Sequence, residues 1–325
     1  MRKVFVLVIA LAALVALGDA LILPRARLDP FKLTAFLTCF VLTLAAFVSL
    51  AIPGFVKLLR PLALQSPWLA LALPGTLLLP YFILAFGTGT FSFWALLKLT
   101  AYIAAPNLLL LPDRMQHVHR AGWRDFAAML ALALPVMANW LEGIWIWPED
   151  LYLFRPLFCV CVGAYAFMVM RNLDGVGYRL TFRKGDLIDG ATNFLAFMVP
   201  CIPLGYALHF IRFHAQPVSL SEFIFQFVGI YLTIAIPEEF LFRGVLQNFL
   251  VRSLTSKRRG LYGLLIAAVI FGASHMHHAP VPNWRYAIMA TLAGLFYGNA
   301  YRTRQRLSSP ALTHTLVDTV WHFWF

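Results

Sequence analysis

Residues 236–244 read IPEEFLFRG and place two adjacent glutamates and an arginine inside an apolar run that continues to Leu250. A charge at the middle of a bilayer costs at least about 2.5 to 3.5 kcal/mol on insertion scales, so such residues are candidates for function. A simpler interpretation is an interfacial helix end, where the charges contact water. Because apolar sequence flanks the charges on both sides, we expect them to lie within the membrane.

The composition of the chain excludes an ordinary soluble domain. Of its 325 residues, 61% are hydrophobic and only 12% are charged, which predicts a multi-pass integral membrane protein. The net charge of +12 is spread over short loops, which favours membrane lipids as partners over nucleic acid. All four cysteines fall in apolar segments and are interpreted as small core residues: Cys39, Cys159, Cys161 and Cys201.

The apolar runs predict an all-α transmembrane bundle of about eleven membrane helices. The segment 92–112 is the weakest of them, because Lys98, Pro106 and Asn107 interrupt it. The runs fall near 4–23, 35–55, 68–86, 92–112, 126–147, 151–170, 188–211, 221–250, 260–277, 286–301 and 309–325.

The N-terminus is compatible with a cleaved signal peptide or with an uncleaved first helix. Its apolar run extends to Leu23, long enough to span a membrane, so we expect the uncleaved helix. Basic loops alternate with loops poor in positive charge, which predicts a cytoplasmic N-terminus in a bacterial-type plasma membrane. The loop PRARLDPFK, residues 24–32, breaks this alternation.

The first polar cluster is the glutamate pair itself. Glu239 and Arg243 are four residues apart, so they share a helical face and can form an ion pair. Glu238 points about 100° away from Glu239 and is left for another role. Pro237 removes a backbone donor and frees the carbonyl of Thr233, which favours a kink and a polar opening.

A second cluster lies in FGASHMHH, residues 271–278, with Phe271 one helical turn before His275. Gly272 and its small neighbours would let another helix approach closely. A lone histidine near a helix end is usually a polar group at the interface, and we interpret His277 and His278 in this way.

A third cluster lies in ALTHTLVDTVWHFWF, residues 311–325, where His314, Asp318 and His322 are spaced by four. Counting 1.5 Å per residue from the flanking loops gives each residue a depth below the inner membrane boundary. The depth is about 21 Å for Glu238 and 22 Å for His275, but about 8 to 10 Å for His314 and near 20 Å for His322. His322 therefore stays a candidate.

These three clusters, in this order, resemble the CAAX prenyl protease and bacteriocin-processing family, also called Abi or CPBP. Its pattern is Glu-Glu followed by Arg, then Phe-x-x-x-His, then His-x-x-x-Asn or Asp. The segments FLFRGVLQNFL (240–250) and AGLFYGNAYRTRQRLSSPALTH (293–314) also resemble the family. The resemblance covers roughly residues 221–325, about a third of the chain, and leaves residues 1–186 as a transmembrane helical region of unknown role. It further implies an intramembrane protease domain at 187–325, with a four-helix catalytic core whose motifs span 221–325.

By that resemblance, the chain hydrolyses a peptide bond of a membrane-associated or lipidated protein or peptide. The family pattern makes Glu238 the general base, helped by His275, with Glu239 and Arg243 in support. It assigns oxyanion stabilisation to His314 and Asp318. An ionised Asp318 would repel the developing charge, so it must be protonated or must orient His314. A carboxylate in low-dielectric surroundings is more basic than one in water, which suits Glu238 as the general base.

Other interpretations remain open at the level of sequence. Glu238, His275 and His314 would make a two-histidine, one-carboxylate zinc site, but HExxH is absent, so we favour a site without cofactor or metal. Membrane Glu, His and Asp residues also build ion-coupled transporters. A third possibility is an inactive scaffold, against which the complete motif set argues.

Overall fold

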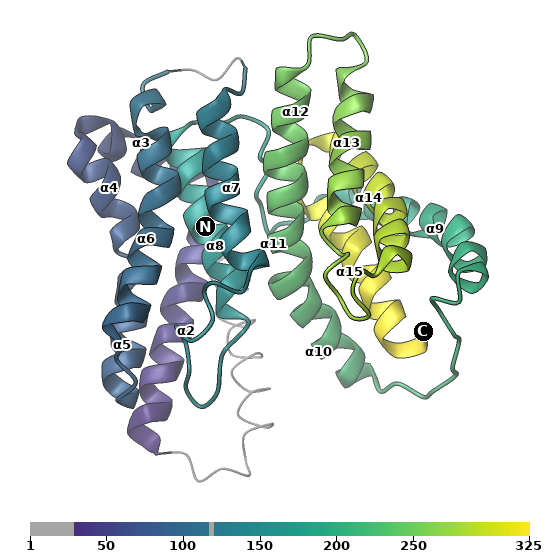
Figure 1. The fold of residues 1–325 in the computed structure, drawn as a ribbon, viewed down its shortest axis with the longest axis horizontal. Helices are drawn as coiled ribbons and strands as arrows, with labels where there is room; N and C mark the ends of the chain where they lie inside the picture. Colours follow the sequence, from purple (N-terminus) through teal and green to yellow (C-terminus); the bar gives the residue numbers. More distant parts are fainter. Residues whose placement is uncertain (1–28, 117–119) are drawn as a thin grey trace. The chain divides into compact units, whose positions relative to one another are not determined.

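The computed structural model describes residues 29–116 and 120–325, and all regular structure within these ranges is helical (Figure 1). Five of these helices are long and apolar enough to cross a membrane. The spans are Pro30–Leu50, Pro67–Thr88, Phe93–Asp113, Lys184–Ala207 and Leu220–Ser253. The chain is therefore an all-helical integral membrane protein, although the predicted number of eleven spans is not reproduced. The predicted first helix, 4–23, lies outside the described residues.

The chain divides into two compact units, one ending at Leu173 and the other, apart from a short connecting stretch, beginning at Asp174. The predicted domain boundary lies thirteen residues later, after residue 186. The first unit contains α2 (Pro30–Leu50), α3 (Pro53–Gln65), α4 (Pro67–Gly75), α5 (Leu78–Thr88), α6 (Phe93–Leu110), η1 (Leu111–Asp113), α7 (Trp123–Met137), α8 (Phe154–Ala164) and η2 (Tyr165–Met170).

The core of the first unit forms around α8, in which every residue except Pro156 is buried. Helices α2 and α7 pack against it, and the ring of Trp145 stacks on Phe154. One charged pair is buried in this unit, since Arg171 Nε donates to Asp125 Oδ1 at 2.7 Å. This ion pair connects α7 with the end of η2, 46 residues further along the chain.

Two predicted features of the first unit are wrong. No helix was predicted over most of α3, because residues 56–67 lie between two apolar runs and contain Lys57 and Arg60. Arg60 instead donates to the carbonyl of Val169 at 2.7 Å, which holds this helix against η2. The helix predicted at 126–147 ends at Met137, because Asn139 adopts a positive φ of 53°. Non-glycine residues rarely adopt such a conformation, and it turns the chain out of the helix.

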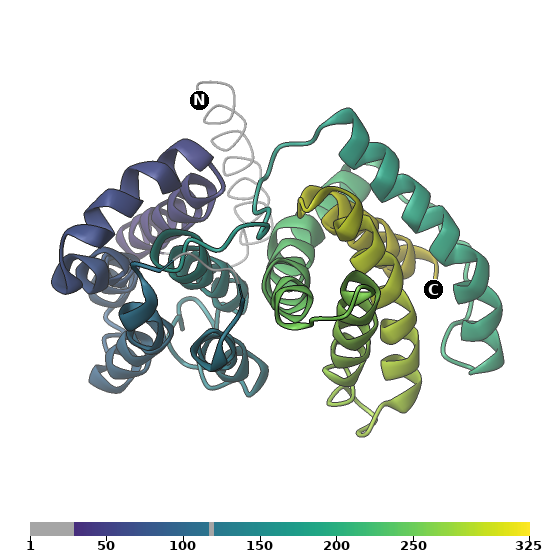
Figure 2. The same cartoon turned by 90° about the horizontal axis from the view of Figure 1, so that it is seen from above.

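The second unit is a bundle built around one long helical column. The column runs from Leu220 to Ser253 as α10 (Leu220–Ile230), η3 (Tyr231–Ala235), α11 (Ile236–Glu239), η4 (Phe240–Gln247) and α12 (Asn248–Ser253). Next to it lie α13 (Arg259–Ala273), α14 (Trp284–Arg304) and α15 (Ser308–Trp324). Helix α9 (Lys184–Ala207) covers α14 and α15 from outside (Figure 2).

Close helix packing in this unit depends on small residues. A Cβ added to Gly272 on α13 would meet Thr291 Oγ1 and, at 2.5 Å, the carbonyl oxygen of Ala287 on α14. A Cβ on Gly294 would lie 3.0 Å from Cα of Ala268. The close approach predicted for Gly272 is therefore confirmed.

A buried ion pair fixes the start of α15. Nε of Arg306 lies 2.9 Å from Oδ2 of Asp186, and Arg306 also donates to the carbonyl of Thr181. Asp186 accepts from the backbone N–H of Arg183 and closes the first turn of α9. The last basic residue before α15 is thus drawn inside the unit, and α15 begins among buried side chains.

Candidate active site

The glutamate pair lies on α11, a single turn between two π-helical segments, η3 and η4. Pro237 lacks an N–H, so the ordinary hydrogen bond to the carbonyl four residues earlier cannot form. The wider π turns on both sides accommodate this defect while the column continues. Such local widening is frequent at functional sites and changes the direction of the side chains that follow.

Glu239 is fully buried and binds two cationic or proton-donating groups through one oxygen. Arg243 Nη1 donates to Glu239 Oε1 at 3.0 Å, as the spacing of four predicts. His314 Nδ1 donates to the same oxygen at 2.8 Å. The guanidinium of Arg243 is also enclosed by aromatic rings and lies 4.3 Å above Phe271. Glu239 therefore connects the column to α15.

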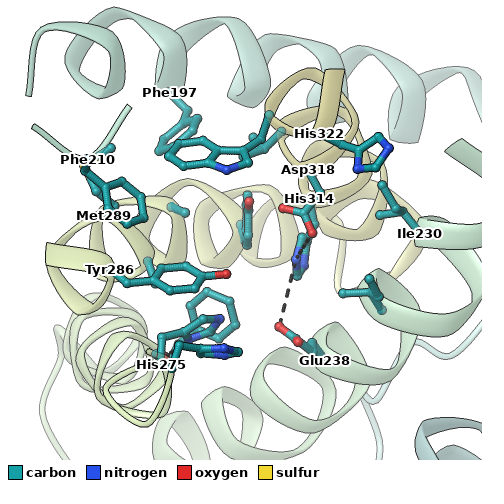
Figure 3. A pocket seen from close by; sticks show the side chains of 18 of the residues that line it. Phe197, Phe210, Ile230, Glu238, His275, Tyr286, Met289, His314, Asp318 and His322 are labelled. Carbon is teal, nitrogen blue, oxygen red and sulfur yellow. Dashed lines mark hydrogen bonds and ion pairs between the residues drawn. The ribbon is translucent and has the colours of Figure 1, made fainter. Parts of the chain in front are cut away.

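His314 is surrounded by carboxylates on both edges of its ring. Beyond the Nδ1 contact with Glu239, its Nε2 lies 3.3 Å from Asp318 Oδ2 and 3.9 Å from Glu238 Oε2 (Figure 3). His314 therefore lies close to Glu238, although counting along the helices from the flanking loops gave the two residues different depths. The count for His314 started from a charged loop, and Arg306 in that loop is buried.

Glu238 and Asp318 remain accessible, unlike Glu239. Their side chains are 34% and 33% exposed, and both line one cavity. Oε2 of Glu238 is buried and has no hydrogen-bond partner in the described part of the chain. A carboxylate that is reachable from a cavity and not saturated by donors can accept a proton.

His275 reaches the same cavity from the end of α13. Its Nδ1 lies 2.8 Å from the carbonyl oxygen of Phe271, and because a carbonyl only accepts, Nδ1 carries the proton. In the neutral ring, Nε2 is then the acceptor. The site therefore offers two acceptors, the Glu238 carboxylate and His275 Nε2, from two different helices.

The cavity has a volume of about 430 Å³ and lies entirely within the second unit. Figure 3 shows Glu238, His275, Tyr286, His314 and Asp318 around it. Apolar side chains form the rest of the wall, among them Ile230, Ile234, Met289 and Trp321.

The predicted site residues are brought together to different degrees. Glu238, His275, His314 and Asp318 line the cavity, while Glu239 and Arg243 lie behind it. His322 also lines the wall, and its side chain is exposed.

The lining residues without a site role in the sequence analysis include one histidine and two tyrosines. His278 was assigned to the interface, but it lines the cavity and lies 5.0 Å from the ring of Tyr286. Tyr286 and Tyr297 were not singled out at all. Their spacing carried a signal, because Tyr286, Ala290, Ala293 and Tyr297 follow offsets of four, three and four on one helical face.

The zinc alternative predicted from the sequence names Glu238, His275 and His314 as ligands. Within residues 29–116 and 120–325, no three His, Cys, Asp or Glu side chains are arranged to hold a metal ion. Both nitrogens of His314 face carboxylates, so this imidazole offers no free ligand atom.

Fold and site together define a class: an integral membrane helical bundle with a Glu–Glu–Arg, His and His–Asp site around a partly apolar cavity. Residues 220–320 match the family model of the Rce1-like proteins, described as type II CAAX prenyl endopeptidase Rce1-like. The match confirms the resemblance predicted from the three motifs. Comparison with curated proteins and with solved structures gives no match.

Proposed function

We propose that the protein is an intramembrane endopeptidase that hydrolyses a peptide bond of a membrane-associated protein or peptide with glutamate-activated water. One observation carries the proposal: the side chains of Glu238 and His275, whose Nε2 is left as an acceptor, line one cavity inside a segment that matches the endopeptidase family. A water molecule has two protons, and the site provides an acceptor for each.

The reaction follows from these groups. Glu238 takes one proton of water, while His275 Nε2 accepts a hydrogen bond from the other. The water oxygen forms a bond to the carbonyl carbon, and the π electrons of the carbonyl move onto its oxygen. When this intermediate collapses, the C–N bond breaks and the proton held by Glu238 passes to the leaving nitrogen. The products are a carboxyl group and an amine, and Glu238 regains its charge.

The other site residues hold this machinery in place. Glu239 orients His314 through Nδ1 and balances the charge of Arg243. Asp318 lies at Nε2 of the same ring and fixes it from the opposite edge. This supports the orienting role of Asp318, one of the two that the sequence left open. The apolar wall suits a substrate segment that arrives from the lipid phase.

Purified protein in liposomes provides the test, with a farnesylated peptide ending in a CAAX sequence as one probe and its unprenylated counterpart as another. We expect release of the C-terminal tripeptide, measured by mass spectrometry. In H₂¹⁸O, one heavy oxygen atom should enter the new carboxylate.

Glu238→Gln keeps the size of the side chain but removes the base, so kcat should fall by at least about 100-fold.

His277→Ala is the matched control, because His277 is exposed, does not line the cavity and contacts the carbonyl of Ser274 and the ring of His278. This variant should cleave at the wild-type rate. Undiminished turnover in Glu238→Gln would refute the proposed mechanism. Wild-type protein that leaves both peptides intact would favour the transporter or the scaffold.

A further inference from the structure

Tyr286 is a cavity-lining residue whose hydroxyl the proposed mechanism has not yet used. It lies in the first turn of α14, where the side chain of Asn283 accepts from its backbone N–H at 3.0 Å. Its ring packs against His275 at 4.7 Å, His278 at 5.0 Å and Phe210 at 5.4 Å. The residue is therefore held by a helix cap and by three rings.

The hydroxyl of Tyr286 points into the cavity, toward the side where Glu238, His314 and Asp318 lie (Figure 3). In the described part of the chain it takes part in no hydrogen bond. A phenolic O–H that is fixed in direction and unoccupied can donate to a group that enters the cavity.

The hydrolysis described above needs such a donor, because charge develops on the carbonyl oxygen. His314 is poorly placed to provide it. Its Nδ1–H is engaged by Glu239, and its Nε2 faces Asp318 and Glu238. Any proton on Nε2 is therefore shared with carboxylates. Asp318, with its own oxygen directed at the imidazole, adds negative charge where negative charge must be stabilised.

Tyr297 also lines the cavity but is less suited to this task. Its ring stacks on His314 at 4.6 Å and lies beneath the Arg243 guanidinium at 5.2 Å. With 1% of its surface exposed, Tyr297 is enclosed by the support structure. Tyr286 is only half-buried and can be reached by a substrate.

We infer that Tyr286 is a catalytic residue whose hydroxyl donates a hydrogen bond to the carbonyl oxygen of the scissile peptide. The bond strengthens as the water oxygen adds to the carbon and the carbonyl electrons move onto oxygen. No proton is transferred, and the hydroxyl is released when the C–N bond breaks. The inference rests on the proposed function and names an oxyanion donor outside the three motifs.

The test compares Tyr286→Phe with wild-type protein in liposomes, with the farnesylated CAAX peptide as the probe. Phenylalanine keeps the ring packed on His275 and removes only the hydroxyl. Loss of one oxyanion donor should lower kcat by about 100- to 1,000-fold and leave KM nearly unchanged. Incorporation of 3-fluorotyrosine at position 286 restores the donor and should restore most of the activity.

Tyr262→Phe is the control for loss of a tyrosine hydroxyl, since Tyr262 lies on α13 and is exposed. It should keep the wild-type kcat. Wild-type kcat in Tyr286→Phe beside an inactive Glu238→Gln would overturn the inference and leave the proposed function intact. A higher KM with unchanged kcat would overturn it too, because the hydroxyl would then contribute to binding alone. If wild type does not cleave the probe or Glu238→Gln is fully active, the proposed function and this inference both fall.

Discussion

At the scale of single residues, the site is organised by His314. One imidazole contacts three carboxylates, and the guanidinium of Arg243 forms an ion pair with one of them, Glu239. Buried charges of this kind persist only when each has a partner. The spacing of Glu239 and Arg243 predicted their pairing, whereas the contact of Glu239 with His314 joins residues 75 positions apart and no local pattern reveals it.

Arg243→Met should destabilise the protein, because it leaves Glu239 buried without its cation. Removal of one partner from a buried pair costs about 3 to 5 kcal/mol, so thermal unfolding in detergent should occur at a clearly lower temperature. Activity should be lost as well. Arg304→Met is the matched control. Its ion pair with Asp189 is 43% exposed at the arginine and should contribute about 0 to 1 kcal/mol.

The double variant Glu239→Leu with Arg243→Met separates stability from function. Replacement of both charges by apolar side chains should recover much of the unfolding temperature, because neither charge is left alone. Cleavage should stay low, since His314 Nδ1 then lacks its acceptor. A double variant with wild-type kcat would mean that the orientation of His314 does not depend on Glu239.

At the scale of helices, local π turns and small residues determine where the site residues point. Pro237 predicted a disturbance in the column, but the helix continues through widened turns instead of breaking. The sequence predicted a column at 221–250 and α13 at 260–277, close to the observed Leu220–Ser253 and Arg259–Ala273. It could not place Tyr286, because the position of its ring depends on three rings from two other segments, Phe210 and the stretch that carries His275 and His278.

Gly272→Val tests whether the contact between α13 and α14 positions His275. A side chain at this position would collide with Thr291 Oγ1 and the Ala287 carbonyl, and the two helices would have to separate. We expect a stability loss of about 1 to 3 kcal/mol and a lower kcat, because His275 follows less than one turn later. Gly229→Val is the control, since a Cβ at Gly229 meets nothing within 4 Å. Equal kcat values for the two variants would contradict this positioning role.

At the scale of the whole molecule, composition was enough to predict a helical membrane protein, because an apolar chain must satisfy its backbone hydrogen bonds internally. The number of spans was harder to predict. Hydropathy detects helices as long apolar runs. Helix α3 contains Lys57 and Arg60, so it does not stand out as such a run although it is a helix. Likewise, the three motifs predicted which residues gather at the site, whereas Arg306, which is buried against Asp186 at the start of α15, resembled part of an ordinary basic loop.

The purified protein offers a direct test of the metal question. Because carboxylates face both nitrogens of His314, we expect cleavage of the farnesylated probe to be unchanged by a strong chelator. Metal analysis of the same preparation should find less than one zinc per chain. Activity that disappears with the chelator and returns with added zinc would instead support the two-histidine, one-carboxylate alternative.

The ion pair between Arg306 and Asp186 bears on how this catalytic module could be excised or transplanted. The family match begins at residue 220, yet the carboxylate that neutralises Arg306 belongs to the first turn of α9. A fragment that begins at residue 220 would lack Asp186 and would leave the buried guanidinium of Arg306 without its partner, next to the helix that carries His314. Any portable version should therefore start upstream of Thr181, whose carbonyl also receives Arg306.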